Sequence, residues 1–277
     1  MAVILRNTLI VVLVAAGLAC SSSPDVVNPS VEQRFNRAKA LFDDEDYLEA
    51  INEFTVITLQ YQGSAFAADA QYYLGECRFA RGEYILSAFE YSVVRTSYPA
   101  SPRVPDAQYK LGLSYYMQSP KPVLDQQNTR KAIDEFQAFV EYYPGHPMAA
   151  DAEVKIKELT DRLAFKAYEA ARQYERMEYY RAAILSYDVV IEKYHDTDYA
   201  PMAYLDKADL LVRRLRFREA ESTIKEFQSK YPNSVLRSRA DGILEKIKGE
   251  LEVNRGDAAG TKIERNDGYP AAAGAGT

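Results

Sequence analysis

The sequence predicts an all-α fold, an α-solenoid of five helical hairpins with a spacer helix and a C-terminal capping helix. A tyrosine closes each of five similar segments: Tyr61, Tyr98, Tyr143, Tyr194 and Tyr231. Seven residues before each tyrosine stands a large apolar residue: Phe54, Tyr91, Phe136, Tyr187 and Ile224. Eleven residues before it stands a small one: Ala50, Ser87, Ala132, Ala183 and Ala220. Such spacing favours helices with one buried face, and five copies in register indicate an array of repeats.

Residues 69–99 show the unit most clearly. Both halves have apolar residues at three- and four-residue steps, and Gly82 lies in the turn between them. Pro99 ends the second helix, because proline has no N–H to donate and disfavours a helical residue before it. The first helices share a small residue that allows close approach: Ala38, Gly75, Gly112, Ala171 and Ala208. One hairpin cannot bury its apolar faces alone, so the unit needs neighbours.

The repeats resemble the tetratricopeptide repeat over roughly residues 30–233. The chain has no tryptophan, and aromatic residues stand one position beyond the usual place: Phe35, Tyr72, Tyr109 and Tyr168. The resemblance implies a solenoid that is used for binding and not for chemistry.

Composition excludes several classes of function. A net charge of −6 argues against a general nucleic-acid binder, which needs a basic surface. The sequence has no glycine-rich phosphate loop, paired-histidine helix or nucleophile elbow, so we expect neither an enzyme nor a cofactor. His146 and His195 lack partners at metal-ligand spacing, which predicts no metal site. Cys77 lies within a predicted helix and is expected to be a small buried hydrophobic residue.

The N-terminus predicts a lipid anchor. Residues 1–19 have one charge and an apolar run that is too short to span a bilayer, and small residues precede Cys20. This segment resembles a bacterial lipoprotein signal, which implies cleavage before Cys20 and acylation there, with palmitate among the attached chains. It departs from the usual motif at Gly17, and an uncleaved N-terminal anchor is the alternative. Ser21 resembles the sorting position of lipoproteins that face the periplasm from the outer membrane.

We expect five segments along the chain. Ser30 and Gln33 form a predicted capping box that opens the first repeat. A charged helix over 149–163 is expected to be a spacer, and a polar helix over 234–251 is expected to close the solenoid. The segments are a signal peptide at 1–19, a lipidated tether at 20–29, repeats 1–3 at 30–148, the spacer, repeats 4–5 and capping helix at 149–252, and a disordered tail at 253–277.

An insertion in the third repeat carries a narrower resemblance. Residues 117–128 include Pro120 and Pro122, which favour an extended path, and either Asn128 or Thr129 is expected to cap the next helix. Such a long loop is either functional or tolerated. With the run at 122–133 and its continuation to Pro144, the insertion resembles the third repeat of the BamD family, lipoproteins of the outer-membrane β-barrel assembly machinery.

The resemblance implies a function. It implies a lipoprotein that binds unfolded outer membrane protein precursors and contacts a BamA-like barrel subunit through its POTRA domains. Two other classes stay open from the sequence. One is a periplasmic scaffold lipoprotein, peptidoglycan-associated or Tol-type, and the other is a substrate-capturing lipoprotein of a transport system.

Two surfaces are candidate binding sites. The first is a groove for an extended precursor, lined by six aromatic residues at a repeated spacing: Phe35, Phe42, Tyr72, Phe79, Tyr109 and Tyr116. Packing between the helices as core is the alternative interpretation of these residues. Arg78 and Lys110 are expected nearby, as partners for a carboxylate.

The second candidate is a run of arginines in the turn of the fifth repeat: Arg213, Arg214, Arg216 and Arg218. Arginine pairs with carboxylates in a bidentate manner, so the run predicts a dock for an acidic partner surface. A solvated turn is the alternative. By resemblance to the BamD family, this part of the chain contacts a POTRA domain.

Overall fold

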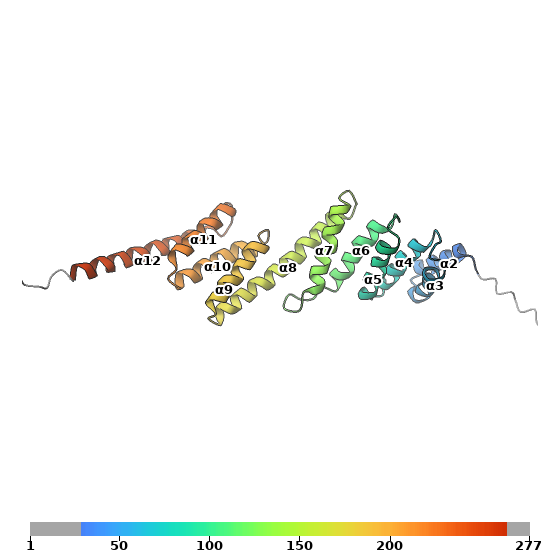
Figure 1. The fold of residues 1–277 in the computed structure, drawn as a ribbon, viewed down its shortest axis with the longest axis horizontal. Coiled ribbons are helices and arrows are strands. Elements are labelled where there is room, and N and C mark those ends of the chain that lie inside the picture. The colour runs from blue at the N-terminus through green and yellow to red at the C-terminus, as the bar shows by residue number, and fades with distance from the viewer. Residues whose placement is uncertain (1–28, 265–277) are drawn as a thin grey trace, which may run out of the picture. The chain divides into compact units, whose positions relative to one another are not determined.

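The computed structural model describes residues 29–264, and side chains are described as far as Glu252. Within this part every regular element is an α-helix (Figure 1), which confirms the predicted all-α class. The helices are α2 (Val31–Asp43), α3 (Tyr47–Gln60), α4 (Ala67–Ala80), α5 (Tyr84–Ser97), α6 (Val104–Met117), α7 (Gln127–Tyr142), α8 (Ala149–Arg176), α9 (Tyr180–Lys193), α10 (Tyr199–Arg213), α11 (Phe217–Lys230) and α12 (Arg237–Glu264). The predicted signal peptide, Cys20 and nearly all of the tether lie outside the described residues.

The helices belong to two compact units. Unit 1 ends at Arg81 and contains α2 to α4, and unit 2 begins at Gly82 and contains α5 to α12. This division falls earlier in the chain than residue 148, where we expected repeats 1–3 to end. The predicted domain boundaries stay predictions.

The closing tyrosines end the second helix of every repeat. Each is the C-cap residue of its helix, and its N–H donates to the carbonyl four residues before it: Tyr61 to Ile57, Tyr98 to Val94, Tyr143 to Phe139, Tyr194 to Val190 and Tyr231 to Phe227. The residues seven and eleven positions before each tyrosine are fully buried. The register deduced from the sequence is therefore the register of the core.

The turns of four repeats share one backbone feature. A single residue in each has a positive φ: Glu45 at 62°, Gly82 at 74°, Glu178 at 63° and Leu215 at 57°. This conformation costs roughly 1–2 kcal/mol for a residue with a Cβ, and only Gly82 avoids that cost. The repeat geometry thus imposes the same turn on sequences that do not favour it.

Unit 1 begins with the predicted capping box. Ser30 Oγ accepts from the N–H of Gln33 at 3.2 Å, and Gln33 Oε1 accepts from the N–H of Ser30 at 3.0 Å. The core of the unit lies between α2, α3 and α4 and includes Ala38, Phe54 and Leu74. The capping box satisfies two backbone donors at the exposed start of α2.

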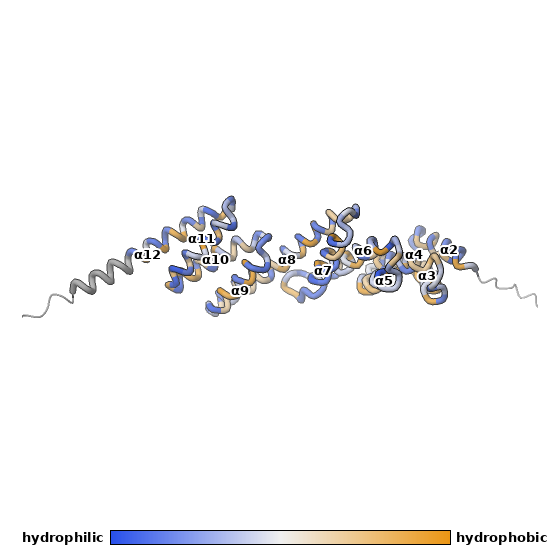
Figure 2. The backbone as a smooth tube through the Cα atoms, turned by 45° about the horizontal axis from the view of Figure 1, so that its top comes forward, coloured by the Kyte–Doolittle hydropathy of each residue, from blue (hydrophilic) through white to orange (hydrophobic). Residues whose placement is uncertain are grey.

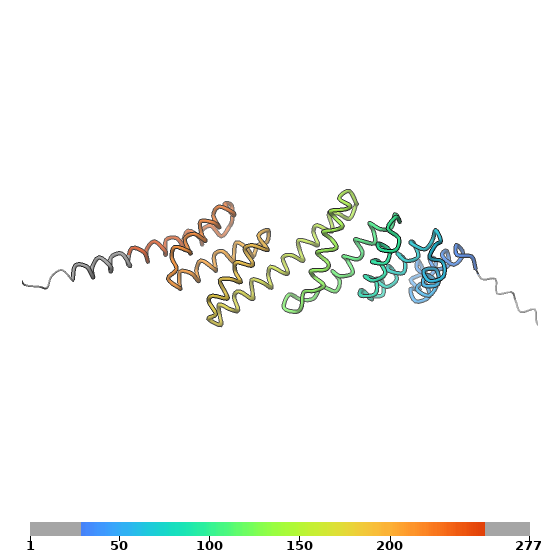
Figure 3. Tube along the Cα trace, in the orientation of Figure 1, coloured from blue at the N-terminus to red at the C-terminus, as the bar shows by residue number. Residues whose placement is uncertain are grey.

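In unit 2, α8 joins two predicted elements. The spacer and the first helix of repeat 4 form one uninterrupted helix, which Figure 3 shows as a single long coil. The segment between Leu163 and Tyr168 contains neither proline nor glycine, so nothing there ends the helix. Hydrophobic and hydrophilic residues alternate along the helices of this unit (Figure 2), as amphipathic packing requires.

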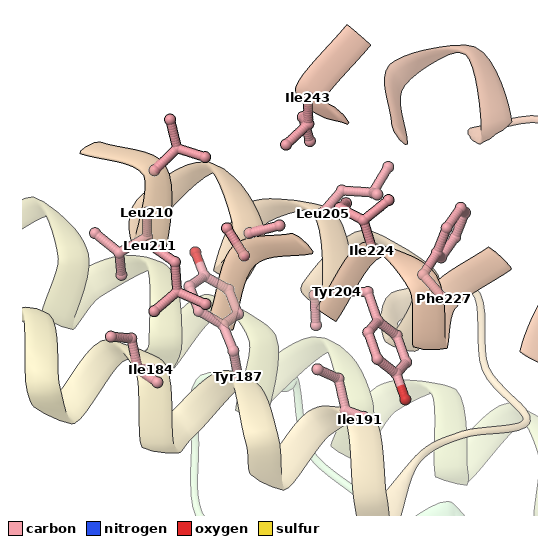
Figure 4. Close-up of a cluster of buried hydrophobic side chains, with 14 of the residues drawn as sticks. Ile184, Tyr187, Ile191, Tyr204, Leu205, Leu210, Leu211, Ile224, Phe227 and Ile243 are labelled. Atoms are coloured by element: carbon pink, nitrogen blue, oxygen red, sulfur yellow. The ribbon is translucent and has the colours of Figure 1, made fainter. Parts of the chain in front are cut away.

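The core of repeats 4 and 5 is continuous with the capping helix. Figure 4 shows Ile184 and Tyr187 of α9 reaching toward Leu211 of α10, and Ile224 of α11 beside Leu205 of α10. Ile243 of α12 belongs to the same buried cluster. The predicted closing helix therefore covers the apolar end of repeat 5.

Two local expectations differ from the structure. The helix after the insertion begins at Gln127, so neither Asn128 nor Thr129 is its cap. Thr129 is buried instead, and its hydroxyl donates to Gln126 Oε1 at 2.7 Å. At the other end, α12 continues to Glu264, past residue 253, where we expected the tail to begin. Among the described residues no helix is long and apolar enough to cross a membrane.

Candidate functional site

In unit 1 the predicted groove residues Phe35 and Phe42 form part of an aromatic cluster. The ring of Phe35 lies 5.8 Å from Phe54 and 6.2 Å from Tyr73, and that of Phe42 lies 5.3 Å from Tyr73. Lys39 Nζ sits 5.1 Å from the centroid of Tyr73. Phe35 and Phe42 are half-buried, so each contributes to the core and keeps an accessible edge.

The centre of this cluster is Tyr73, which the sequence analysis did not single out. Phe35, Phe42 and Phe54 all contact Tyr73, and the last of these stacks on it at 5.7 Å. Its neighbour Tyr72 is 8% exposed, and Phe79 is half-buried. The adjacent pair Tyr72 and Tyr73 was the visible signal in the sequence. Successive residues on a helix point about 100° apart around its axis, so the two tyrosines face different neighbours.

In unit 2 the predicted groove residues Tyr109 and Tyr116 are tied to α8. Tyr109 is 5% exposed, its ring lies 5.5 Å from that of Phe139, and its hydroxyl donates to Asp151. The hydroxyl of Tyr116 donates to Glu158 at 2.7 Å. Burial raises the pKa of Tyr109, and the hydrogen bond to Glu158 raises that of Tyr116, so both phenols stay protonated donors.

The geometry separates the six groove residues by accessibility. Tyr72 and Tyr109 are buried, and a peptide could not contact them in this conformation without displacing other side chains. Phe35, Phe42, Phe79 and Tyr116 are half-buried. A precursor-binding role for the six stays a prediction, and the four accessible members are the better candidates within their own units.

The predicted arginine dock is split between two surfaces. Arg213 donates to Glu175 of α8 and lines a charged cavity there. The guanidinium of Arg214 lies 4.6 Å from the ring centroid of Tyr180, and Arg216 binds Glu219 through two hydrogen bonds of 2.7 and 2.5 Å. Arg218 is exposed and lines neither cavity.

Arg214 and Arg216 edge a cavity of about 960 Å³ beside the start of α9. Its walls are mainly apolar and include Tyr179 and Leu185, which are 57% and 58% exposed. Arg181 adds a third arginine, and no ion pair among the described residues involves it. We call this cavity the arginine-edged cavity. Sequence reasoning missed its apolar wall, although Tyr179-Tyr180 beside the repeat-4 turn was a visible signal.

The side chains with ordinary catalytic chemistry are not assembled here. Cys77 is fully buried, and burial raises its pKa to about 12, so it remains an unreactive thiol at neutral pH. His146 Nε2 lies 3.3 Å from Asp106, and His195 contacts Asp196 in an exposed turn. Within the described part of the chain, no group of three or more potential ligands could hold a metal ion.

Successive helical hairpins with buried apolar faces define a helical-repeat protein. The family model YfiO, described as outer membrane lipoprotein, matches residues 28–211. The chain belongs to this family of outer membrane lipoproteins.

A named relative agrees with the predicted BamD resemblance. The chain is 27% identical over 240 residues to outer membrane protein assembly factor BamD of Rickettsia prowazekii (strain Madrid E). The match covers 86% of this chain and 94% of that protein. Together with the family match it confirms the assignment to the BamD family.

Solved tetratricopeptide structures resemble the chain only loosely. The TPR2AB domain of yeast Sti1, in complex with pHSP90, gives a TM-score of 0.39 at 13% identity and covers 80% of this chain and 84% of that one. The TPR domain of P58(IPK) gives 0.41 at 16% identity and covers 81% and 66%. The helical-hairpin architecture rests on the chain's own helices and not on these likenesses.

Proposed function

We propose that this protein is a lipoprotein component of the outer-membrane β-barrel assembly machinery that acts by binding and not by catalysis. The observation that carries the proposal is the family match over residues 28–211, joined by the relative named as an assembly factor. In this role the protein holds unfolded barrel precursors and a BamA-like subunit close together. It faces the periplasm from a lipid anchor at Cys20.

The arginine-edged cavity supports the contact with the barrel subunit. Exposed apolar side chains such as Tyr179 and Leu185 lose contact with water when a partner covers them, and that loss is favourable. Arg181 and Arg214 stand at the edge of the cavity and select carboxylates. A POTRA domain that presents an apolar side chain flanked by acidic residues fits this chemistry.

Precursor binding is assigned to the accessible aromatic edges. Phe35 and Phe42 in unit 1, and Tyr116 in unit 2, keep part of their rings exposed. Aromatic rings pack against apolar and aromatic side chains of an extended chain at low entropic cost, because they have few rotatable bonds. Such contacts suit an unfolded barrel precursor, whose apolar side chains are not yet buried.

A pulldown in mild detergent from the cell's own envelope tests the assignment. We expect a BamA-like subunit to be recovered with the wild-type protein. The double variant Arg181→Glu with Arg214→Glu should reduce that recovery at least tenfold, because reversed charges repel the acidic partner. The matched control, Lys193→Glu with Lys248→Glu, makes the same charge change outside the cavity and should leave recovery unchanged.

The outcomes separate the competing functions. Recovery of peptidoglycan-associated or Tol-type proteins in place of a barrel subunit would support the scaffold alternative. Recovery of a transport complex would support a substrate-capturing lipoprotein. A barrel subunit that is recovered equally with both double variants would keep the machinery assignment and remove the arginine-edged cavity as the dock.

A further inference from the structure

The insertion between α6 and α7 is a loop whose backbone is held in place by hydrogen bonds from side chains. Gln126 is 1% exposed, and its amide donates to the carbonyl of Leu124 at 3.0 Å. From α8, Arg162 donates to Ser119 Oγ at 2.8 Å and Lys166 donates to the same Leu124 carbonyl at 2.5 Å. Two cationic side chains of α8 therefore hold the loop in place. A loop that is merely tolerated would need no such anchoring.

The anchored loop and α8 enclose a small cleft. Its volume is about 330 Å³, and its walls include Pro122 and Val123 from the loop and Phe165 and Ala170 from α8. Val123 is 78% exposed, so its side chain is accessible to a partner. The cleft has room for one bulky apolar side chain, and its far end reaches Arg176.

Arg176 also lines a second cavity of about 440 Å³, built by α8, α9, α10 and α12. The carboxylates in this cavity are already occupied. Glu175 accepts from the hydroxyl of Tyr187 at 2.7 Å and from Arg213. The two aspartates of α10 bind Arg239, each at 2.6 Å.

The cations in the second cavity are in excess. Arg176 and Lys246 are exposed, and neither takes part in an ion pair within the described residues. Every carboxylate in the cavity has a donor of its own, so these two charges have no acidic partner within it. The cavity thus presents surplus positive charge on a protein whose net charge is −6.

We propose that the cleft and the cavity form one docking track along α8 for an extended polypeptide segment of a partner. The segment carries a bulky apolar side chain that enters the cleft and carboxylate side chains that reach Arg176 and Lys246. Phe165 and Arg176 are about three helical turns apart, which is roughly 16 Å. An extended chain advances about 3.3 Å per residue, so the apolar and acidic residues stand roughly five positions apart.

The docking track is a different surface from the arginine-edged cavity. It shares no lining residue with that cavity. An acidic polypeptide fits better than a lipid headgroup, because a phosphate would occupy the cationic end alone and leave the apolar cleft beside Val123 empty. The proposal therefore commits to a polypeptide, and a lipid is an outcome of the test.

Fluorescence anisotropy with synthetic peptides tests the track on the full-length protein in detergent. Each labelled peptide contains one phenylalanine and a pair of glutamates that begins two, five or eight positions after it, with glycine and serine residues between them. We expect the tightest binding at a spacing of five. Arg176→Glu and Val123→Asp should each weaken that peptide about tenfold or more, because one removes a charge-assisted contact and the other an apolar wall.

The control is Lys193→Glu, which makes the same charge change at an exposed residue outside both the track and the arginine-edged cavity and should leave peptide affinity unchanged. All three substituted side chains are exposed, and matching thermal unfolding curves verify that the variants fold. Equal affinity at every spacing, or a loss with Arg176→Glu no larger than with Lys193→Glu, would overturn the proposal. Displacement of the peptide by phosphatidylglycerol added to the detergent micelles, with no dependence on phenylalanine, would assign the cationic end to lipid and also overturn it.

Discussion

At Gly112 of α6, the packing between two helices depends on the absence of a Cβ atom. A Cβ at this position would lie 2.8 Å from Cδ1 of Phe136, closer than real contacts allow. The corresponding residues of repeats 1, 4 and 5 are alanines, each fully buried. In the third repeat the residue at this position has no Cβ, and the ring of Phe136 lies where one would stand.

We expect Gly112→Ala to destabilise the protein by about 1–3 kcal/mol, because the ring of Phe136 has to move in a packed core. The better helix propensity of alanine offsets at most about 1 kcal/mol of this. The matched control is Gly242→Ala on the exposed side of α12, where no atom lies within 4 Å of the added Cβ. That variant should gain up to about 1 kcal/mol in urea unfolding. Equal stabilisation by both variants would contradict the close packing.

At the scale of single residues, the sequence predicted which repeat positions are buried better than it predicted where each side chain points. The small residue at Gly112 and the fully buried Phe136 follow from the repeat register. The register could not decide between Tyr72 and Tyr73, because both fit an apolar face that is about 100° wide. Tyr73 is central in unit 1 since three aromatic rings from α2 and α3 converge on it. That convergence is a tertiary fact that spacing along one helix does not contain.

Between elements, tyrosine–carboxylate hydrogen bonds connect one hairpin to the next in unit 2. Tyr109 and Tyr116 of α6 stand seven residues apart, and so do their acceptors Asp151 and Glu158 of α8. Tyr168 of α8 makes the equivalent bond to an aspartate of α10. Two bonds at the same spacing fix the rotation of α8 against α6, because both fit only one alignment of the helices.

This arrangement separates the core and groove interpretations by experiment. Tyr109→Ala should destabilise the protein by about 3 kcal/mol or more, because it empties a buried aromatic site and removes the hydroxyl that donates to Asp151. Tyr116→Ala should cost about 1 kcal/mol, since Tyr116 is half-buried. Precursor-peptide affinity, measured at a temperature where both variants are folded, should fall for Tyr116→Ala. Unchanged affinity in that variant would remove Tyr116 from the groove.

The sequence predicted the helices correctly as helices, but it predicted where they end less well. Two helices extend past their predicted ends. No breaker separates the spacer from repeat 4 in α8, and α12 continues beyond residue 253 although glycines stand at 256 and 260. The insertion was visible in the sequence, but its anchoring by Arg162 and Lys166 was not, because those cations lie more than 40 positions away along the chain. The apolar wall of the arginine-edged cavity was missed for the same reason, since it forms where two turns meet.

For the molecule as a whole, the net charge conceals a local excess of cations. The chain carries 40 acidic and 34 basic residues, yet two separate surfaces of unit 2 are edged by arginines. An acidic protein is kept from nonspecific contacts with other acidic molecules, while local arginines still select carboxylates at particular places. Both surfaces are suited to protein partners, which agrees with a binding role for the family.

The proposed membrane attachment of the whole molecule rests on Cys20, which lies outside the described residues. We predict that mass spectrometry of the detergent-extracted protein finds a mature chain that begins at Cys20 and carries acyl chains, and that palmitate labelling is lost in Cys20→Ala. Several acyl chains hold a protein on a membrane where one would not, since each buried CH₂ contributes about 0.8 kcal/mol. The matched control is Cys77→Ala, because Cys77 is buried and its thiol is protonated, so labelling should persist. A mature wild-type chain that retains residues 1–19 without acyl groups would instead establish the uncleaved N-terminal anchor.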